Sequence, residues 1–207
     1  MPVTLSLTPD YGYVLAAAGV IGITSTYIGA QVMSLRAKCF KSESFTASKA
    51  VQAMRDEHKK AFGTDMNNLG YPGTARRACA RTRTAQEPRV HLRARARARG
   101  TDMGNGRYAA QLDYASWVMF NNGQRAHYNM VESVGPLVGA LLTSGLAAPR
   151  LAASLGVCYA LGRLLYARGY CSEQGADGRI PGAGLAFLSM LSLYVLAIVQ
   201  GVRAALF

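Results

Sequence analysis

Residues 11–33 read YGYVLAAAGVIGITSTYIGAQVM, and no side chain in this stretch carries a charge. Three further apolar segments follow, at 134–148, 151–169 and 180–202. A bilayer core requires about 20 mostly apolar residues per helix. The first and last segments meet this length alone, the second does so if it begins near Tyr114, and the third does so if Arg163 and Arg168 lie at its ends or face inward. The sequence therefore predicts an all-α integral membrane protein with four transmembrane helices.

We expect one multi-pass membrane domain over residues 1–207, with its helices arranged as an up-down bundle. The first segment is interpreted as a retained helix and not as a cleaved signal peptide, because no basic region precedes it. Lys and Arg are concentrated between the first and second segments and between the third and fourth, so the positive-inside rule places both loops in the cytosol. The four helices are expected near 11–36, 113–147, 150–171 and 180–204.

A long cytosolic insert is expected over residues 42–112. Its first part, 42–62, has the pattern of an amphipathic helix, with Ala50, Val51, Met54 and Phe62 on one side. Its basic block, 73–101, holds nine arginines and one glutamate and is predicted to be disordered, because it cannot build a core. Two interpretations stay open. The block is attracted to anionic lipid headgroups, or it has no role and is either translated non-coding sequence or a lineage-specific insert. No specific nucleic-acid partner is expected, because the block has no aromatic side chain to stack on bases.

A polar patch opens the second apolar segment. Arg125, Asn129 and Glu132 follow the spacing i, i+4, i+7, so on a helix they share one face. Ionisable residues that enter a bilayer usually face the interior of a bundle and mark a site. The cytosolic ends of the other helices add cations and tyrosine hydroxyls, which together suit an anionic, water-soluble ligand that also carries an ammonium group. Glu132 could hold that ammonium, and the lipid side would admit an apolar second substrate. The four cysteines show no CxxC spacing, so neither a disulfide framework nor a metal site is expected.

Three stretches of this sequence resemble the MAPEG family, the membrane-associated proteins in eicosanoid and glutathione metabolism, and most of all its branch of microsomal glutathione transferases and leukotriene C synthases. The family pattern R-A-[QH]-x-N-x-x-E is similar to residues 125–132, RAHYNMVE. The ending R-x-x-Y-x-x-G-Y is similar to residues 163–170, RLLYARGY, and Q-V-x-S-x-R is similar to residues 31–36, QVMSLR. The three motifs occur in the family's order on the predicted helices.

The resemblance implies a homotrimer that binds glutathione between neighbouring subunits on the cytosolic side. Arg179, at the start of the fourth helix, would be the catalytic residue that stabilises the glutathione thiolate. Arg163 and Lys38 are further candidates for binding, and a structural ion pair between Arg163 and Glu132 is an alternative. By matched position, the residues that would contact glutathione are Arg36, Arg125, His127, Asn129, Glu132, Tyr166 and Tyr170.

The implied activity is that of a membrane glutathione transferase or peroxidase. The thiolate would attack a lipophilic electrophile or reduce a lipid hydroperoxide, with glutathione as co-substrate and no metal. The endoplasmic reticulum is the favoured membrane, with mitochondrial and plastid envelopes as alternatives. A non-catalytic lipid-binding scaffold, or an accessory subunit of a membrane complex, is the alternative function.

Two departures from the family pattern bear on the site. Ser133 stands where Tyr often follows the motif glutamate, and Ala37-Lys38 follows Arg36 where a second arginine occurs in leukotriene C synthases. Lys59-Lys60 also resembles the basic end of the family's first helix, which is an alternative register for that motif.

We predict that the basic block is dispensable for folding. A variant that lacks residues 73–101 should trimerise and bind glutathione within a few fold of the full chain, because the deleted composition cannot support a core. Size-exclusion chromatography in detergent and titration with glutathione would check this. A variant that no longer folds would show that the block contains an ordered element.

Overall fold

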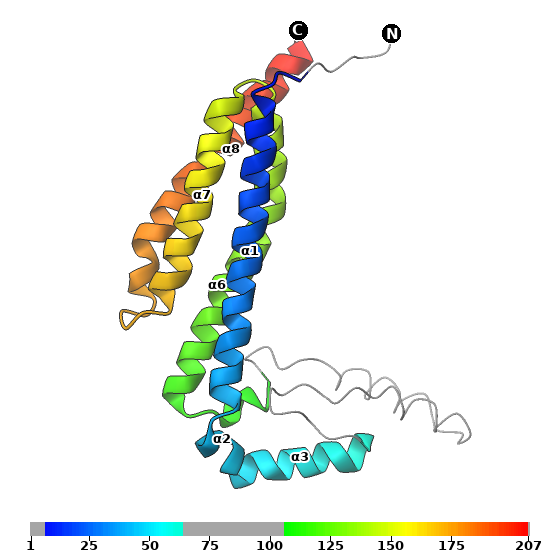
Figure 1. Cartoon of the computed structure of the whole chain (residues 1–207), viewed down its shortest axis with the longest axis vertical. Coiled ribbons are helices and arrows are strands. Elements are labelled where there is room, and N and C mark those ends of the chain that lie inside the picture. The colour runs from blue at the N-terminus through cyan, green and yellow to red at the C-terminus, as the bar shows by residue number, and fades with distance from the viewer. Residues whose placement is uncertain (1–6, 64–105, 207) are drawn as a thin grey trace, which may run out of the picture. The chain divides into compact units, whose positions relative to one another are not determined.

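The computed structural model describes residues 7–63 and 106–206, so the predicted disorder of the block at 73–101 lies outside the described residues. Every regular element in the described part of the chain is a helix (Figure 1). The chain divides into two compact units. The first unit contains residues 1–32 and 125–207, and the second contains residues 33–124.

Four long helices occupy the four apolar segments. α1 ends at Phe40 and so extends beyond the expected end near residue 36, whereas the other three begin and end within two residues of the expected bounds. Pro149 occupies the first turn of α7, where a missing N–H is tolerated. The Asp113 carboxylate accepts a hydrogen bond from the Ser116 backbone N–H at 2.9 Å and so caps the start of α6. The helices are α1 (Tyr11–Phe40), α6 (Tyr114–Gly145), α7 (Pro149–Tyr170) and α8 (Ile180–Leu206).

Small residues let α7 and α8 approach each other closely. A Cβ atom built on Gly182 would collide with the backbone N of Tyr166, and one built on Gly162 would lie 2.6 Å from the backbone N of Ala186. Gly169 and Gly178 meet in the same way where the two helices are connected. Such contacts between small residues are typical of helices that pack in membranes.

Further contacts within the first unit join α6 to α1 and to α8. The Tyr11 hydroxyl donates to the Leu142 carbonyl at 3.1 Å, and the Ser144 hydroxyl lies 2.9 Å from the Leu193 carbonyl. Gly145 again makes room, because a Cβ there would lie 2.7 Å from Val14. The buried core draws on all four helices, including Ile21 of α1.

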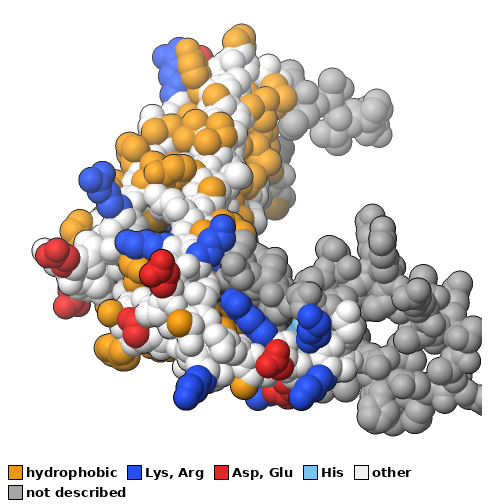
Figure 2. Space-filling model, turned by 60° about the horizontal axis from the view of Figure 1, so that its bottom comes forward, with side chains coloured by type: hydrophobic (Ala, Val, Ile, Leu, Met, Phe, Trp, Pro, Cys, Tyr) orange, Lys and Arg blue, Asp and Glu red, His pale blue; other side chains and the backbone are white. Residues whose placement is uncertain are grey.

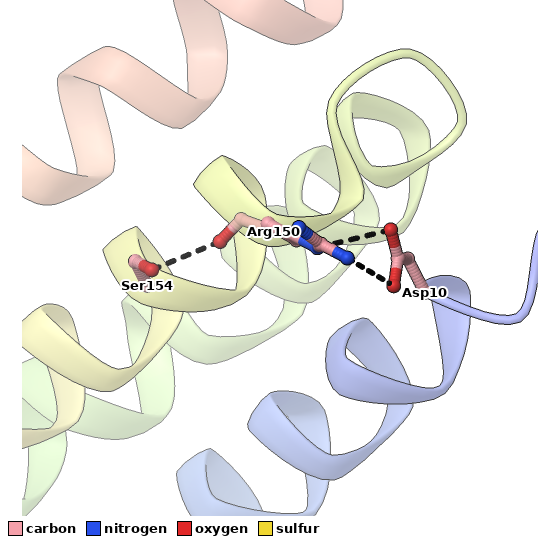
Figure 3. A network of polar contacts seen from close by, with 3 residues as sticks. All are labelled: Asp10, Arg150 and Ser154. Atoms are coloured by element: carbon pink, nitrogen blue, oxygen red, sulfur yellow. Dashed lines mark hydrogen bonds and ion pairs between the residues drawn. The ribbon is translucent and has the colours of Figure 1, made fainter.

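An exposed ion pair joins the residue before α1 to the first turn of α7 (Figure 3). Arg150 Nε lies 3.0 Å from one Asp10 carboxylate oxygen, and its Nη2 donates to the other at 3.2 Å. The Ser154 hydroxyl donates to the Arg150 carbonyl at 2.9 Å. The Arg150 side chain is 78% exposed, so water screens the pair and its contribution to stability is about 1 kcal/mol or less.

In the second unit, part of the predicted insert lies beside a cluster of aromatic rings. Two short helices, α2 (Glu43–Ala47) and α3 (Lys49–Phe62), follow α1, and a 3-10 turn, η2 (Ala109–Gln111), precedes α6. On α3, Val51 and His58 are buried and Met54 is half-buried, whereas Ala50 is exposed and so does not share the buried face as expected. The rings of the cluster lie 5.0–5.3 Å apart between centroids and belong to Phe40, Phe45, Tyr108 and Phe120.

Much of the apolar surface of the long helices is exposed in the single chain (Figure 2). Within the described residues, two helices are long and apolar enough to cross a membrane, Tyr11–Phe40 and Asp177–Leu206. Ile23 on the first is 72% exposed, and Ile198 on the second is 66% exposed. Large outward-facing apolar side chains on long helices suit a lipid environment or a second apolar surface.

We predict opposite effects for two glycines of α8. Gly182→Ala should lower the free energy of unfolding by about 1–3 kcal/mol, because the new Cβ forces the α7 and α8 backbones apart. Gly184→Ala is the matched control, since a Cβ there meets nothing within 4 Å. It should leave stability unchanged or raise it, because alanine favours a helix over glycine. Thermal unfolding in detergent would measure both, and equal effects would refute the packing argument.

Candidate functional site

The polar patch of α6 lies on its exposed side. Arg125, Asn129 and Glu132 are all exposed in the single chain. Asn129 is bonded to α7, but neither Arg125 nor Glu132 has a hydrogen-bond or ion-pair partner among the described residues. Two opposite charges on an apolar helix thus remain available to a ligand or to a second copy of the chain.

Arg163 of α7 is buried beneath this patch with only 5% of its surface exposed. Its Nη1 donates to the Asn129 side-chain oxygen at 2.7 Å, and its Nη2 donates to the Ala126 carbonyl at 3.5 Å. Its guanidinium carbon lies 4.8 Å from the centroid of the Tyr166 ring. In the described part of the chain, Arg163 forms no ion pair with Glu132, so the structure favours the amide partner over the carboxylate alternative.

One donor of Arg163 remains unused. Its Nε is buried and has no hydrogen-bond partner within the described residues. A buried polar atom without a partner costs free energy, and such atoms often face a ligand or water site. The buried cation is therefore suited to receive an anionic group.

Arg179 ends a 3-10 turn, η3 (Asp177–Arg179), which leads directly into α8. Its Nη1 donates to the Tyr170 hydroxyl at 3.1 Å, and its guanidinium carbon lies 5.0 Å from the centroid of the same ring. The Gly169–Gly178 contact brings the end of α7 against this turn, so the tyrosine and the arginine meet. Arg179 is half-buried, and Tyr170 therefore fixes the direction of a cation that is still accessible.

A partly open pocket of about 350 Å³ collects these groups within the first unit. Its polar wall comes from α6, α7 and the turn η3, and its apolar wall comes from α8 alone. The polar lining residues are Asn129, Ser133, Tyr159, Arg163, Tyr166 and Arg179, and the apolar ones are Ala183, Ala186, Phe187 and Met190. The pocket thus combines two cations and several hydroxyls with an apolar surface, which suits a polar anionic ligand beside a lipophilic one.

Other candidates from the sequence are not among the residues that line this pocket. His127 packs against α1, since a Cβ on Gly29 would lie 3.0 Å from its Nε2. Arg36 lies in the second unit and is 2% exposed, with its guanidinium 5.1 Å from the Phe40 ring centroid and 5.4 Å from that of Phe120. Lys38 also belongs to the second unit and is exposed.

Sequence reasoning placed Ser133 and Tyr159 beside the expected site without giving either a contact, and it missed the apolar residues of α8. Ser133 and Tyr159 lie 2.6 Å apart between their hydroxyl oxygens. Tyr159 stands one turn before Arg163 on the same stripe of α7, so helical periodicity was a usable signal for it. For Phe187 and Met190 the sequence carried no comparable signal, because they resemble any other apolar residue of a membrane helix.

A comparison with known protein families places this chain among them. The model of the MAPEG family matches residues 89–199, which is just over half of the chain. The matched range contains α6 and α7 entirely and most of α8, and with them every residue of the pocket. The matched range begins inside the basic block. The deletion of residues 73–101 therefore also tests whether the matched part of the block is needed for folding.

Proposed function

Because the chain belongs to the MAPEG family, we propose that it is a membrane-bound glutathione transferase or peroxidase. It uses the glutathione thiolate to conjugate lipophilic electrophiles or to reduce lipid hydroperoxides. The observation that carries this proposal is the pocket in which Arg163 and Arg179 face an apolar wall of α8. Glutathione has two carboxylates, one ammonium and one thiol. The pocket offers the cations Arg163 and Arg179 to the anionic groups, and the only nearby carboxylate of the α6 patch, Glu132, is not among the residues that line it.

In this proposal each charge has a separate task. Arg163 and Arg125 hold carboxylates, for which the forked donors of guanidinium are well suited. The otherwise unpartnered carboxylate of Glu132 holds the ammonium. Arg179, held by Tyr170, lies near the sulfur, where a cation favours thiolate over thiol and lowers the thiol pKa.

The assembly is part of the same proposal. We infer an up-down bundle of four membrane-spanning helices that associates as a homotrimer, with glutathione between neighbouring subunits. Support comes from the exposed charges Arg125 and Glu132 and from the exposed apolar surfaces of α1 and α8, which a single chain leaves uncovered. The protein would lie in the endoplasmic reticulum, with the loops after α1 and before α8 in the cytosol.

The direct experiment is retention of the detergent-solubilised protein on glutathione agarose, followed by the ultraviolet absorbance of bound thiolate near neutral pH. We expect both retention and a thiolate signal. A protein that binds glutathione but forms no thiolate and turns over no electrophile would instead be a binding scaffold.

We predict that Arg179→Ala lowers turnover at pH 7 by about 10- to 100-fold, because the loss of a positioned cation raises the thiol pKa by one to two units. Glutathione affinity should change much less, since the carboxylates are held elsewhere. Part of the lost rate should return as the pH rises toward about 8.5, the ordinary pKa of a cysteine thiol.

Arg168→Ala is the matched control for this variant. Arg168 is an exposed arginine in the last turn of α7 and does not line the pocket. It should keep the turnover and the pH profile of the parent. If Arg179→Ala does the same, thiolate stabilisation belongs to another cation.

We also predict that Glu132→Gln weakens glutathione binding by about 10- to 100-fold, as expected for the loss of a hydrogen bond between charged groups. Desamino-glutathione, which lacks the ammonium, should bind the variant and the parent equally. Isothermal titration of both ligands would measure this, with Glu173→Gln in the exposed loop after α7 as the control. A variant that keeps the parent's preference for the amine would assign Glu132 a structural role.

A further inference from the structure

Two hydroxyl groups face each other in the wall of the pocket. The function proposed above gives neither of them a role. The hydroxyl oxygens of Ser133 on α6 and Tyr159 on α7 lie 2.6 Å apart. Tyr159 is 1% exposed, so the pair is held in a protected place, yet both residues line the pocket. The distance is short for two neutral hydroxyls, which marks a well-formed hydrogen bond.

The surrounding acceptors allow this hydrogen bond to run in either direction. The Ser133 hydroxyl also lies 2.9 Å from the Asn129 carbonyl and 3.1 Å from the Met130 carbonyl. When the serine donates to a helix carbonyl, the tyrosine donates to the serine. When the serine turns and donates to the tyrosine, the tyrosine proton leaves the serine and can point to the Met130 sulfur, 3.7 Å from the tyrosine oxygen, or into the pocket. One rotation of each hydroxyl makes this change, and no heavy atom has to move.

The pair lies toward the apolar end of the pocket. Tyr159 precedes Arg163 by four residues, which is about 6 Å along a helix and away from the end where Arg179 lies. The α8 residues that line the pocket farthest from Arg179 are Phe187 and Met190. Phe187 is 57% exposed, so a lipophilic molecule can reach this end from the membrane side.

We propose that the Ser133–Tyr159 pair donates the proton to the leaving oxygen of a lipid hydroperoxide. This inference rests on the proposed function and deepens it. The hydroperoxide carbon chain lies against Phe187 and Met190, and its O–O group lies between the glutathione sulfur and the Tyr159 hydroxyl. The pair thereby selects, among electrophiles, those whose leaving atom is an oxygen that needs a proton.

The reaction balances with two molecules of glutathione. The thiolate sulfur attacks the outer oxygen, so an S–O bond forms, the O–O bond breaks, and its electron pair goes to the inner oxygen. That oxygen takes the Tyr159 proton and leaves as an alcohol, while the sulfur becomes a sulfenic acid. A second glutathione thiol attacks the sulfenic acid and gives the disulfide and water. The proton released when the first thiol ionised returns to Tyr159, with Ser133 donating a hydrogen bond to the phenolate meanwhile.

The test compares two substrates that differ in their need for a proton. Reduction of cumene hydroperoxide requires one at the leaving oxygen, whereas 1-chloro-2,4-dinitrobenzene releases chloride and requires none. Tyr159→Phe should lower hydroperoxide turnover by about 100-fold, the lower range for general acid catalysis. Turnover of the aryl chloride should stay within about twofold of the parent, because the ring and its packing are kept. Ser133→Ala should lower hydroperoxide turnover in the same selective way, though less.

Tyr11→Phe is the matched control. It also removes a tyrosine hydroxyl that bonds between helices, to the Leu142 carbonyl, but its ring does not line the pocket. It should leave the ratio of the two activities unchanged. If Tyr159→Phe and Ser133→Ala lower both activities in parallel, the pair is structural and the inference is overturned. A parent that turns over neither substrate would overturn the proposed function itself, which is a different outcome.

Discussion

The close approach of the α7 and α8 backbones is the constraint on which the site depends. Gly162 and Gly182 leave no side chain between the helices, so the two walls of the pocket stand at a fixed separation. The Gly169–Gly178 contact then sets the turn that presents Arg179 to Tyr170. A larger residue at any of these glycines would move Arg163 and Tyr170 of α7 away from Arg179 and from the apolar wall of α8.

The long helices could be predicted closely from the sequence, because in an apolar environment a run of uncharged residues has few alternatives to a helix. The helix of the insert was predicted too. Of its expected face, Val51 and Met54 are covered and Ala50 is exposed, while the Phe62 side chain lies outside the described residues. Val51 and His58 are buried in a unit that also contains Phe45 and Tyr108, and these residues come from separate stretches of chain. Periodicity identifies that a helix has two faces, and only tertiary packing decides which of them is covered.

In the site, too, the sequence indicated the residue types but did not decide which side chains contact each other. Asn129 and Glu132 share a helical face, so spacing alone did not decide which of them meets Arg163, and the structure gives the place to the amide. Arg36 matched a motif, yet the structure buries its guanidinium against Phe40 and Phe120. Residue type therefore indicated a site for an anion, while the identity of each contact depended on helix rotation and on segments distant in sequence.

We expect the rate of substitution among relatives of this chain to differ strongly between positions of α8. Ile198 and Val202 project from the single chain, and where lipid covers such positions, selection acts on apolar character and not on shape. Leucine, phenylalanine and methionine are then nearly interchangeable, and such positions drift quickly. At Gly182 no larger residue fits, so the lineage must keep it. The same helix would thus hold fast-evolving and nearly frozen positions within a few residues of each other.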